Sequence, residues 1–173
     1  MQKLNLIIGP MFSGKTSLLL SKYKRYTIAD KKCLLVKFYQ DTRYDNLCVV
    51  THDNIKENAI SIKKLSEIDD IVQNYDVVLI DEIQFYDDAF IYCNKWANFM
   101  IVEACGLNGD YKQEPFEQIS LLIPIADNIQ FLTAIDKTNG NDAPFTIRLT
   151  NDDKQIVIGG NQIYEARSRI SLN

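Results

Sequence analysis

The stretch GPMFSGKT, residues 9–16, constrains this chain more than any other part of its sequence. It matches the pattern G-x-x-x-x-G-K-[ST], in which glycines let successive backbone N–H groups point at phosphate oxygens. The apolar run Leu4–Ile8 comes directly before it, and leucines and aromatics at helical spacing follow it. A strand, a glycine loop and a helix in this order predict a phosphate-binding loop within an α/β fold.

The chemistry of such a loop predicts specific ligands. Lys15 binds the β- and γ-phosphates of a nucleotide, and Thr16 offers its hydroxyl to Mg²⁺. A second part is then required, an Asp at the end of an apolar strand, and VVLIDE (Val77 to Glu82) supplies Asp81 there. The alternative is that Asp81 caps the next helix. The two parts together predict binding of a nucleoside triphosphate with Mg²⁺.

Glu82 follows the predicted metal ligand directly. A carboxylate in this place orients a nucleophile, which is water in an ATPase and a substrate hydroxyl in a kinase. A solvated acid at the end of a strand is the alternative. The residue types alone leave these readings open.

The rest of the first two thirds alternates between strand and helix. Apolar runs at Cys33–Tyr39, Val77–Glu82 and Phe99–Leu107 predict buried strands. Lys64–Tyr75 and Asp87–Asn98 predict helices, the second with acids in its first turn. This alternation predicts a parallel sheet flanked by helices.

The last third changes character. Lys137–Pro144 is a polar loop rich in turn residues, and two short β-rich runs follow it, Phe145–Leu149 and Gln155–Gly160. We expect these two runs to form a hairpin. The chain therefore divides into an α/β core, residues 1–134, and a small β-rich subdomain, residues 135–173.

Composition excludes several classes of function. A net charge of -4 gives no general attraction to nucleic acid, and no apolar run approaches the roughly 20 residues of a membrane helix. The segment before the glycine loop is too short for a signal peptide. The 4 cysteines are scattered without a C-x-x-C pair and the chain has 1 His, so neither a disulfide framework nor a zinc site is recognisable. We expect a cytoplasmic protein without nucleic-acid or membrane partners.

GPMFSGKT together with IDEIQFY (residues 80–86) resembles the thymidine kinase family of the small cellular and poxviral type. The pattern of that family is GPMF[SA]GK[ST] followed by DE-x-Q-F-F. Further matching segments follow in order, and the resemblance runs from about Leu4 to Tyr164. They are DTRY (41–44), THD (51–53), GLNGDYKQEPF (106–116) and IGGNQIY (158–164).

The resemblance implies a P-loop core with a small lid, and an enzyme that phosphorylates thymidine to dTMP with ATP and Mg²⁺. Glu82 is then the general base for the 5′-hydroxyl, and Thr16 and Asp81 are the ligands of Mg²⁺. Arg43 neutralises charge on the transferring phosphoryl group, unless it only pairs with Asp41 at the surface. The implied phosphate-binding residues are Gly9, Pro10, Met11, Phe12, Ser13, Gly14, Lys15, Thr16 and Asp41.

An apolar, aromatic-lined slot suits the planar thymine base. Taken singly, each aromatic in this part of the chain is equally suited to a core, and only the family pattern places it in a pocket. The implied pocket residues are Met11, Phe85, Leu107, Tyr111, Phe116, Thr146, Val157, Gly159 and Tyr164.

The sequence departs from the family at the zinc ligands. The family usually carries two C-x-x-C pairs in its small C-terminal domain. Here Ile135–Thr138 replaces the first pair, and EARSRISLN, where the second would fall, has no Cys. We expect no zinc. The family also implies a homotetramer and feedback inhibition by dTTP. Two alternatives stay open: a P-loop ATPase, and a degenerate homologue that binds nucleotide without kinase activity.

Overall fold

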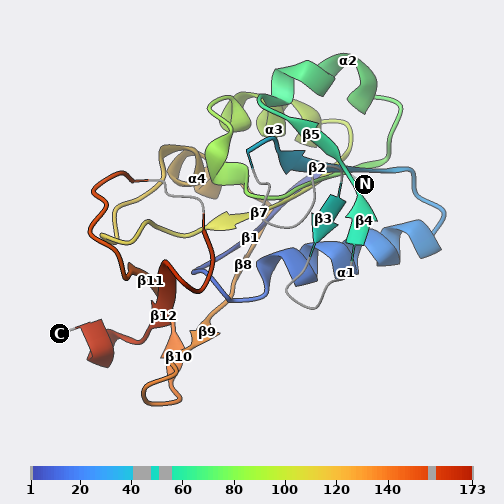
Figure 1. The fold of residues 1–173 in the computed structure, drawn as a ribbon. Helices are drawn as coiled ribbons and strands as arrows, with labels where there is room; N and C mark the ends of the chain where they lie inside the picture. The colour runs from blue at the N-terminus through green and yellow to red at the C-terminus, as the bar shows by residue number, and fades with distance from the viewer. Residues whose placement is uncertain (1, 41–47, 51–55, 156–158, 173) are drawn as a thin grey trace.

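A six-stranded parallel sheet forms the centre of the molecule (Figure 1). The computed structural model describes residues 2–40, 48–50, 56–155 and 159–172. All strand pairs of this sheet are parallel, in the order β5-β2-β6-β7-β1-β8. Its strands are β1 (Lys3–Gly9), β2 (Cys33–Phe38), β5 (Ile60–Ile62), β6 (Val77–Ile80), β7 (Ile101–Leu107) and β8 (Asn128–Phe131). The predicted α/β class with a parallel sheet is confirmed.

Helices cover both faces of the sheet (Figure 1). Alternate residues of the central strands point to opposite faces, so Leu6 of β1 packs with the residues of α3, and Ile7 packs against α1. On one face lies α1 (Lys15–Ile28) alone. The other face carries η1 (Leu65–Ile68), α2 (Asp69–Val72), α3 (Ala89–Ala97) and α4 (Glu117–Leu122), with the short turns η2 (Ile83–Phe85) and η3 (Ile123–Ile125) nearby.

A buried carboxylate joins α1 to the sheet. Glu103 of β7 is 0% exposed and accepts hydrogen bonds from Asn5 (2.7 Å), Tyr26 (2.7 Å) and Lys22 (2.8 Å). The last two residues lie on α1, four positions apart on one side of the helix. These three hydrogen-bond donors compensate the Glu103 carboxylate for its removal from water. The contact fixes the helix whose first turn follows the glycine loop.

Two small antiparallel pairs follow the sheet and lie with the C-terminus at one side of it (Figure 1). The first joins β9 (Ala134–Ile135) to β10 (Asp142–Ala143), and the second joins β11 (Phe145–Arg148) to β12 (Tyr164–Arg167), which leads into η4 (Arg169–Leu172). A third pair joins β3 (Cys48–Val50) to β4 (Lys56–Asn58).

Phe145–Arg148 pairs with Tyr164–Arg167, and Thr146 lies opposite Ala166 with both side chains buried. This pairing, which the sequence did not predict, buries one face of both strands. Residues 156–158 of the predicted partner Gln155–Gly160 lie outside the described residues, so the hairpin predicted with Phe145–Leu149 stays a prediction. The division of the chain near Ala134 stays a prediction, and β9 begins at that residue.

The helix predicted over Asp87–Asn98 begins later than expected, at Ala89. The acids therefore precede its first turn. Asp88 accepts hydrogen bonds of 3.0 Å from the backbone N–H groups of Leu65 and Ser66, which start η1. The carboxylate thus supports a neighbouring turn rather than its own helix. Within the described ranges, every helix is too short or too polar to cross a membrane.

Candidate functional site

The glycine loop occupies the predicted place between β1 and α1. Gly14 has φ 80°, a left-handed conformation that glycine adopts without strain. Phe12 also has a positive φ, 66°. The backbone between Gly9 and Lys15 therefore turns at two residues with positive φ. At Gly9 a Cβ atom would collide with the carbonyl oxygen of Leu132. The loop therefore needs both glycines that bracket it.

The N-terminus of α1 has the character of an anion site. Among the described residues no side chain caps this end of the helix, and its first turn carries no acid. Its N–H groups and the helix dipole therefore favour a phosphate group. Lys15 opens the helix with its side chain buried, and its ammonium group donates a hydrogen bond of 2.6 Å to the carbonyl of Pro10. A single cation thus lies across the loop.

Thr16 and Asp81 meet, as the sequence predicts for two ligands of one cation. The Thr16 hydroxyl lies 3.2 and 3.4 Å from the two carboxylate oxygens, although β7 separates the strands that carry the loop and the acid. These oxygen donors fit Mg²⁺. In the described ranges no group of three His, Cys, Asp or Glu side chains is arranged to hold a metal ion. A Mg²⁺ ion here would therefore also need phosphate and water oxygens.

A buried thiol completes the surroundings of Asp81. Cys105 of β7 donates a hydrogen bond of 2.9 Å to its carboxylate. Burial raises the pKa of the Cys105 thiol well above its ordinary value, and the charge of Asp81 raises that pKa further. The thiol therefore keeps its proton and acts as a donor to the acid.

Glu82 is held in an unusual backbone conformation. Its φ and ψ are 53° and 48°, a left-handed region that costs about 1–3 kcal/mol for a residue with a Cβ atom. Its side chain is 8% exposed, and Gln84 donates a hydrogen bond of 2.7 Å to its carboxylate. The other end of the Gln84 amide accepts a hydrogen bond of 3.1 Å from the backbone N–H of Leu107.

Gly106 makes room for this arrangement. A Cβ atom at that position would lie 2.5 Å from the Gln84 carbonyl oxygen and 2.8 Å from the side chain of Ile83. Gln84 was not among the predicted site residues, although it stands within the IDEIQFY segment. One of its contacts, with Leu107 of β7, comes from more than 20 positions further along the chain, and the local pattern does not reveal it.

The structure brings together some of the predicted pocket residues. The backbone N–H of Met11 donates a hydrogen bond of 2.9 Å to the buried Thr146 hydroxyl, so β11 lies against the glycine loop. Tyr111 and Tyr164 meet on the two sides of Arg148, at 3.8 and 5.3 Å from its guanidinium carbon to the two ring centroids. Arg148, like Gln84, was not among the predicted site residues.

Other predicted pocket residues have core or local contacts among the described residues. Phe116 is buried in the main core cluster with Leu107 packed against it, and Phe85 is half-buried, 5.3 Å from the ring of Phe38. Gly159 lies so close to Ile163 that a Cβ atom would collide with that side chain. Asp41, Arg43 and Val157 lie outside the described residues.

A cavity of about 270 Å³ opens between the glycine loop and the small strands. Of the described residues of the predicted sites, Phe12 and Tyr164 line it. The other described lining residues are Ala134, Ile135, Lys137, Asn161, Glu165, Ala166 and Arg167. The cavity thus shares Tyr164 with the predicted thymine slot.

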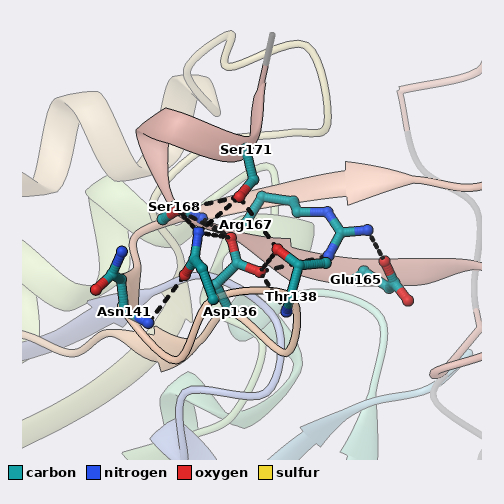
Figure 2. Close-up of polar contacts among 8 residues, drawn as sticks. Asp136, Thr138, Asn141, Glu165, Arg167, Ser168 and Ser171 are labelled. Atoms are coloured by element: carbon teal, nitrogen blue, oxygen red, sulfur yellow. Dashed lines mark hydrogen bonds and ion pairs between the residues drawn. The ribbon is translucent and has the colours of Figure 1, made fainter.

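A polar cluster ties the β9–β10 turn to the C-terminal turn (Figure 2). At its centre the carboxylate of Asp136 is 0% exposed. It accepts hydrogen bonds from Thr138 (N–H 2.9 Å, hydroxyl 2.6 Å) and from Ser168 (N–H 2.8 Å, hydroxyl 2.9 Å). Arg167 lies 3.5 Å from the same carboxylate. The Thr138 hydroxyl above all, and the backbone N–H groups, lower the pKa of Asp136 well below its ordinary value.

The amide of Asn139 completes the cluster, with hydrogen bonds of 3.0 and 2.8 Å to the hydroxyls of Ser168 and Ser171. Asp136 and Asn139, three positions apart, thus face Ser168 and Ser171, which are also three positions apart. Ile135, the first residue of the segment expected to replace a cysteine pair, is 61% exposed and makes no contact within this cluster among the described hydrogen bonds. The predicted absence of zinc stays a prediction.

Comparison with known proteins identifies the family of this chain. The model of the family described as "Thymidine kinase" matches residues 2–172. The chain is 38% identical over 167 residues to a thymidine kinase of rabbit fibroma virus, with 96% of this chain and 93% of the relative covered. It is 39% identical over 163 residues to thymidine kinase 1 of Dictyostelium discoideum (91% and 72% covered). It is also 38% identical over 177 residues to a thymidine kinase of Amsacta moorei entomopoxvirus (98% and 97% covered). A match of this extent, in a chain that joins a glycine loop to Asp81 and Glu82, means that the protein belongs to the thymidine kinase family.

Proposed function

We propose that this protein transfers the γ-phosphoryl group of ATP to the 5′-hydroxyl of thymidine, giving dTMP and ADP for DNA synthesis. The observation that carries the proposal is the pairing of Thr16 with Asp81 (3.2 Å) beside the buried Glu82. A cation-binding pair and a separate carboxylate are what transfer to a hydroxyl group requires. The family membership supplies the nucleoside.

The donor phosphates lie along Gly9–Thr16. The backbone N–H groups of this loop and the uncapped N-terminus of α1 bind phosphate oxygens, and Lys15 moves from the Pro10 carbonyl to the β- and γ-phosphates. Mg²⁺, held by Thr16 and Asp81, neutralises charge on the phosphates when bound. Asp41 and Arg43, from the DTRY segment, are proposed near the transferring phosphoryl group on the resemblance alone.

Glu82 is the general base. Its carboxylate is buried and Gln84 donates a hydrogen bond to one of its oxygens, and we assign this carboxylate as the acceptor of the 5′-hydroxyl proton. A base that is already held in position lowers the entropy cost of reaching the transition state, because little further orientation is needed. Burial also keeps competing water from the carboxylate.

Thymine lies in a slot near Met11, Tyr111, Thr146 and Tyr164. The contact of Met11 with Thr146 and the stack of Tyr111 on Arg148 support this placement, since they bring the glycine loop, β11 and the 110–114 turn towards one another. The remaining members of the proposed slot are Phe85, Leu107, Phe116, Val157 and Gly159.

The finer features implied by the family are also proposed here. They are a homotetramer, inhibition by dTTP, a small subdomain over residues 135–173 and a cytoplasmic location. The free state of Cys33, Cys93 and Cys105 supports a reducing compartment.

A panel of nucleosides with ATP and Mg²⁺ tests the proposal, with monophosphate and ADP measured separately. We expect thymidine to give equal amounts of dTMP and ADP, and ADP without nucleoside to stay at background. ADP release that does not depend on nucleoside would contradict transfer and favour an ATPase. ATP binding without monophosphate from any nucleoside would favour a non-catalytic homologue.

A further inference from the structure

Arg148 connects two tyrosines that the proposed function places in the nucleoside slot. Its guanidinium carbon lies 3.8 Å from the ring centroid of Tyr111, within the range of a cation–π contact, and its Nη2 donates a hydrogen bond of 2.8 Å to the Tyr164 hydroxyl. Tyr111 stands in the turn after β7, and Tyr164 begins β12. One side chain of β11 therefore contacts both.

The same guanidinium holds a stretch of backbone. It donates hydrogen bonds to three carbonyl groups, those of Asp152 (2.6 Å), Lys154 and Gln155 (3.1 Å). Arginine suits this task because its donors diverge in one plane, whereas the ammonium of lysine is a compact point charge. With the Tyr164 hydroxyl, four acceptors surround one end of the side chain.

A second contact links the held backbone to the turn that carries Tyr111. The side-chain amide of Gln155 donates a hydrogen bond of 3.1 Å to Asp110. The other carboxylate oxygen of Asp110 accepts from the backbone N–H groups of Lys112 (2.8 Å) and Glu114 (2.9 Å). The Asp110 carboxylate is 5% exposed. The turn and the 152–155 segment are thus bound to each other as well as to Arg148.

The ring of Tyr111 depends on Arg148 for its position. The Tyr111 hydroxyl is buried and has no hydrogen-bond partner among the described residues, so it does not orient the ring. The two cations over the ring are Arg148 at 3.8 Å and Lys112 at 5.5 Å, measured to the centroid. The closer of the two, Arg148, is therefore the cation that makes the stronger contact with the ring.

We propose that Arg148 is a positioning residue that fixes Tyr111 and Tyr164 as walls of the nucleoside slot, and so sets the affinity for thymidine rather than the rate of phosphoryl transfer. The assignment rests on the proposed function. It follows from position: Arg148 contacts two proposed slot residues and no part of the Lys15–Thr16–Asp81–Glu82 machinery among the described contacts.

Steady-state kinetics with thymidine and ATP test the assignment in the full-length enzyme. For Arg148→Met we expect the KM for thymidine to rise about tenfold or more, because several hydrogen bonds to a charged group are lost. We expect kcat to stay within about threefold and the KM for ATP to stay unchanged. Arg148→Lys should restore little of the affinity, since lysine lacks the planar fork.

Two further variants make the result decisive. Tyr164→Phe keeps the ring and removes the hydroxyl that accepts the hydrogen bond of Arg148, so it should raise the KM for thymidine by a few fold even if Arg148→Met folds poorly. Arg169→Met is the matched control, because Arg169 lies over a ring, that of Phe145 at 4.6 Å, away from the slot; it should behave as the parent.

A KM for thymidine within twofold of the parent in both Arg148→Met and Tyr164→Phe would overturn the assignment, as would a loss confined to kcat or shared equally by ATP. A parent enzyme that converts no thymidine would instead overturn the proposed function, and the assignment with it. Whether the parent enzyme phosphorylates thymidine therefore distinguishes the two failures.

Discussion

The amide of Gln84 donates a hydrogen bond of 2.7 Å to the carboxylate of Glu82, and both side chains are buried at the end of β6. Glu82 is also in a left-handed backbone conformation. A strained residue persists only where its surroundings determine its position. Gln84 holds the carboxylate itself.

Gln84→Met should therefore lower kcat by about tenfold or more, because the general base loses its fixed orientation. Methionine has nearly the same length and fills the same space, so the fold should be retained. The KM for ATP should not change, since the phosphate loop is untouched. Steady-state kinetics measure both quantities, and a kcat within twofold of the parent would exclude a positioning role for Gln84.

Gly106→Ala should damage the same contact from the other side. The added methyl would lie 2.5 Å from the Gln84 carbonyl oxygen, so Gln84 must move and the variant should lose kcat together with about 1–3 kcal/mol of stability. Gly160→Ala is the control, because a Cβ atom there meets nothing within 4 Å.

The double variant of Gln84→Met with Gly106→Ala distinguishes a shared mechanism from two separate ones. If both substitutions act through Glu82, the kcat of the double variant should be no lower than that of the more impaired single variant. Losses of kcat that multiply would show that Gly106 acts independently of Gln84.

Asp136→Asn should lower the melting temperature at pH 7 by about 5 °C or more, because the cluster in Figure 2 loses its charge. The pKa of Asp136 is lowered in the folded state. Its contribution to stability is therefore complete above the unfolded pKa of about 4 and is lost as the pH falls towards the folded value.

The difference in melting temperature between parent and Asp136→Asn should accordingly be constant from pH 8 to pH 5 and shrink below about pH 4. Circular dichroism over this range measures it, with the exposed Asp87→Asn as control. Equal melting temperatures at pH 7, or a difference that grows on acidification, would contradict a charged Asp136.

The buried strands were predictable because each is a continuous apolar run that ends at a glycine, an acid or a turn. β1, β2, β6 and β7 are all of this kind. β8 was not predicted, since it is an edge strand whose four side chains are all exposed. The sequence NIQF therefore lacks the apolar signal of the central strands.

The pairing of β11 with β12 was not predicted, for a related reason. The partner strand, Tyr164–Arg167, alternates buried and half-buried residues in a run that contains two charges. The sequence of this strand therefore has a weak β signal, and the burial of Tyr164 and Ala166 appears only in the fold.

The residues of the site also fall into those that could be predicted from the sequence and those that could not. Lys15, Thr16 and Asp81 were predictable because the chemistry of phosphate and Mg²⁺ fixes residue types at fixed places in a strand–loop–helix unit. Arg148 and Asp136 make contacts with distant segments, and Gln84 connects the neighbouring Glu82 to the distant β7. Their roles follow only from the fold that brings those segments together.

The most direct test of the account measures transfer of labelled γ-phosphate from ATP to thymidine by the parent and by Glu82→Gln, with ATP binding measured in parallel. We predict labelled dTMP from the parent, a kcat lower by about 10²–10⁴-fold in Glu82→Gln, and the same affinity for ATP in both. A Glu82→Gln variant that forms dTMP at the parental rate would contradict the assignment of Glu82 as the base.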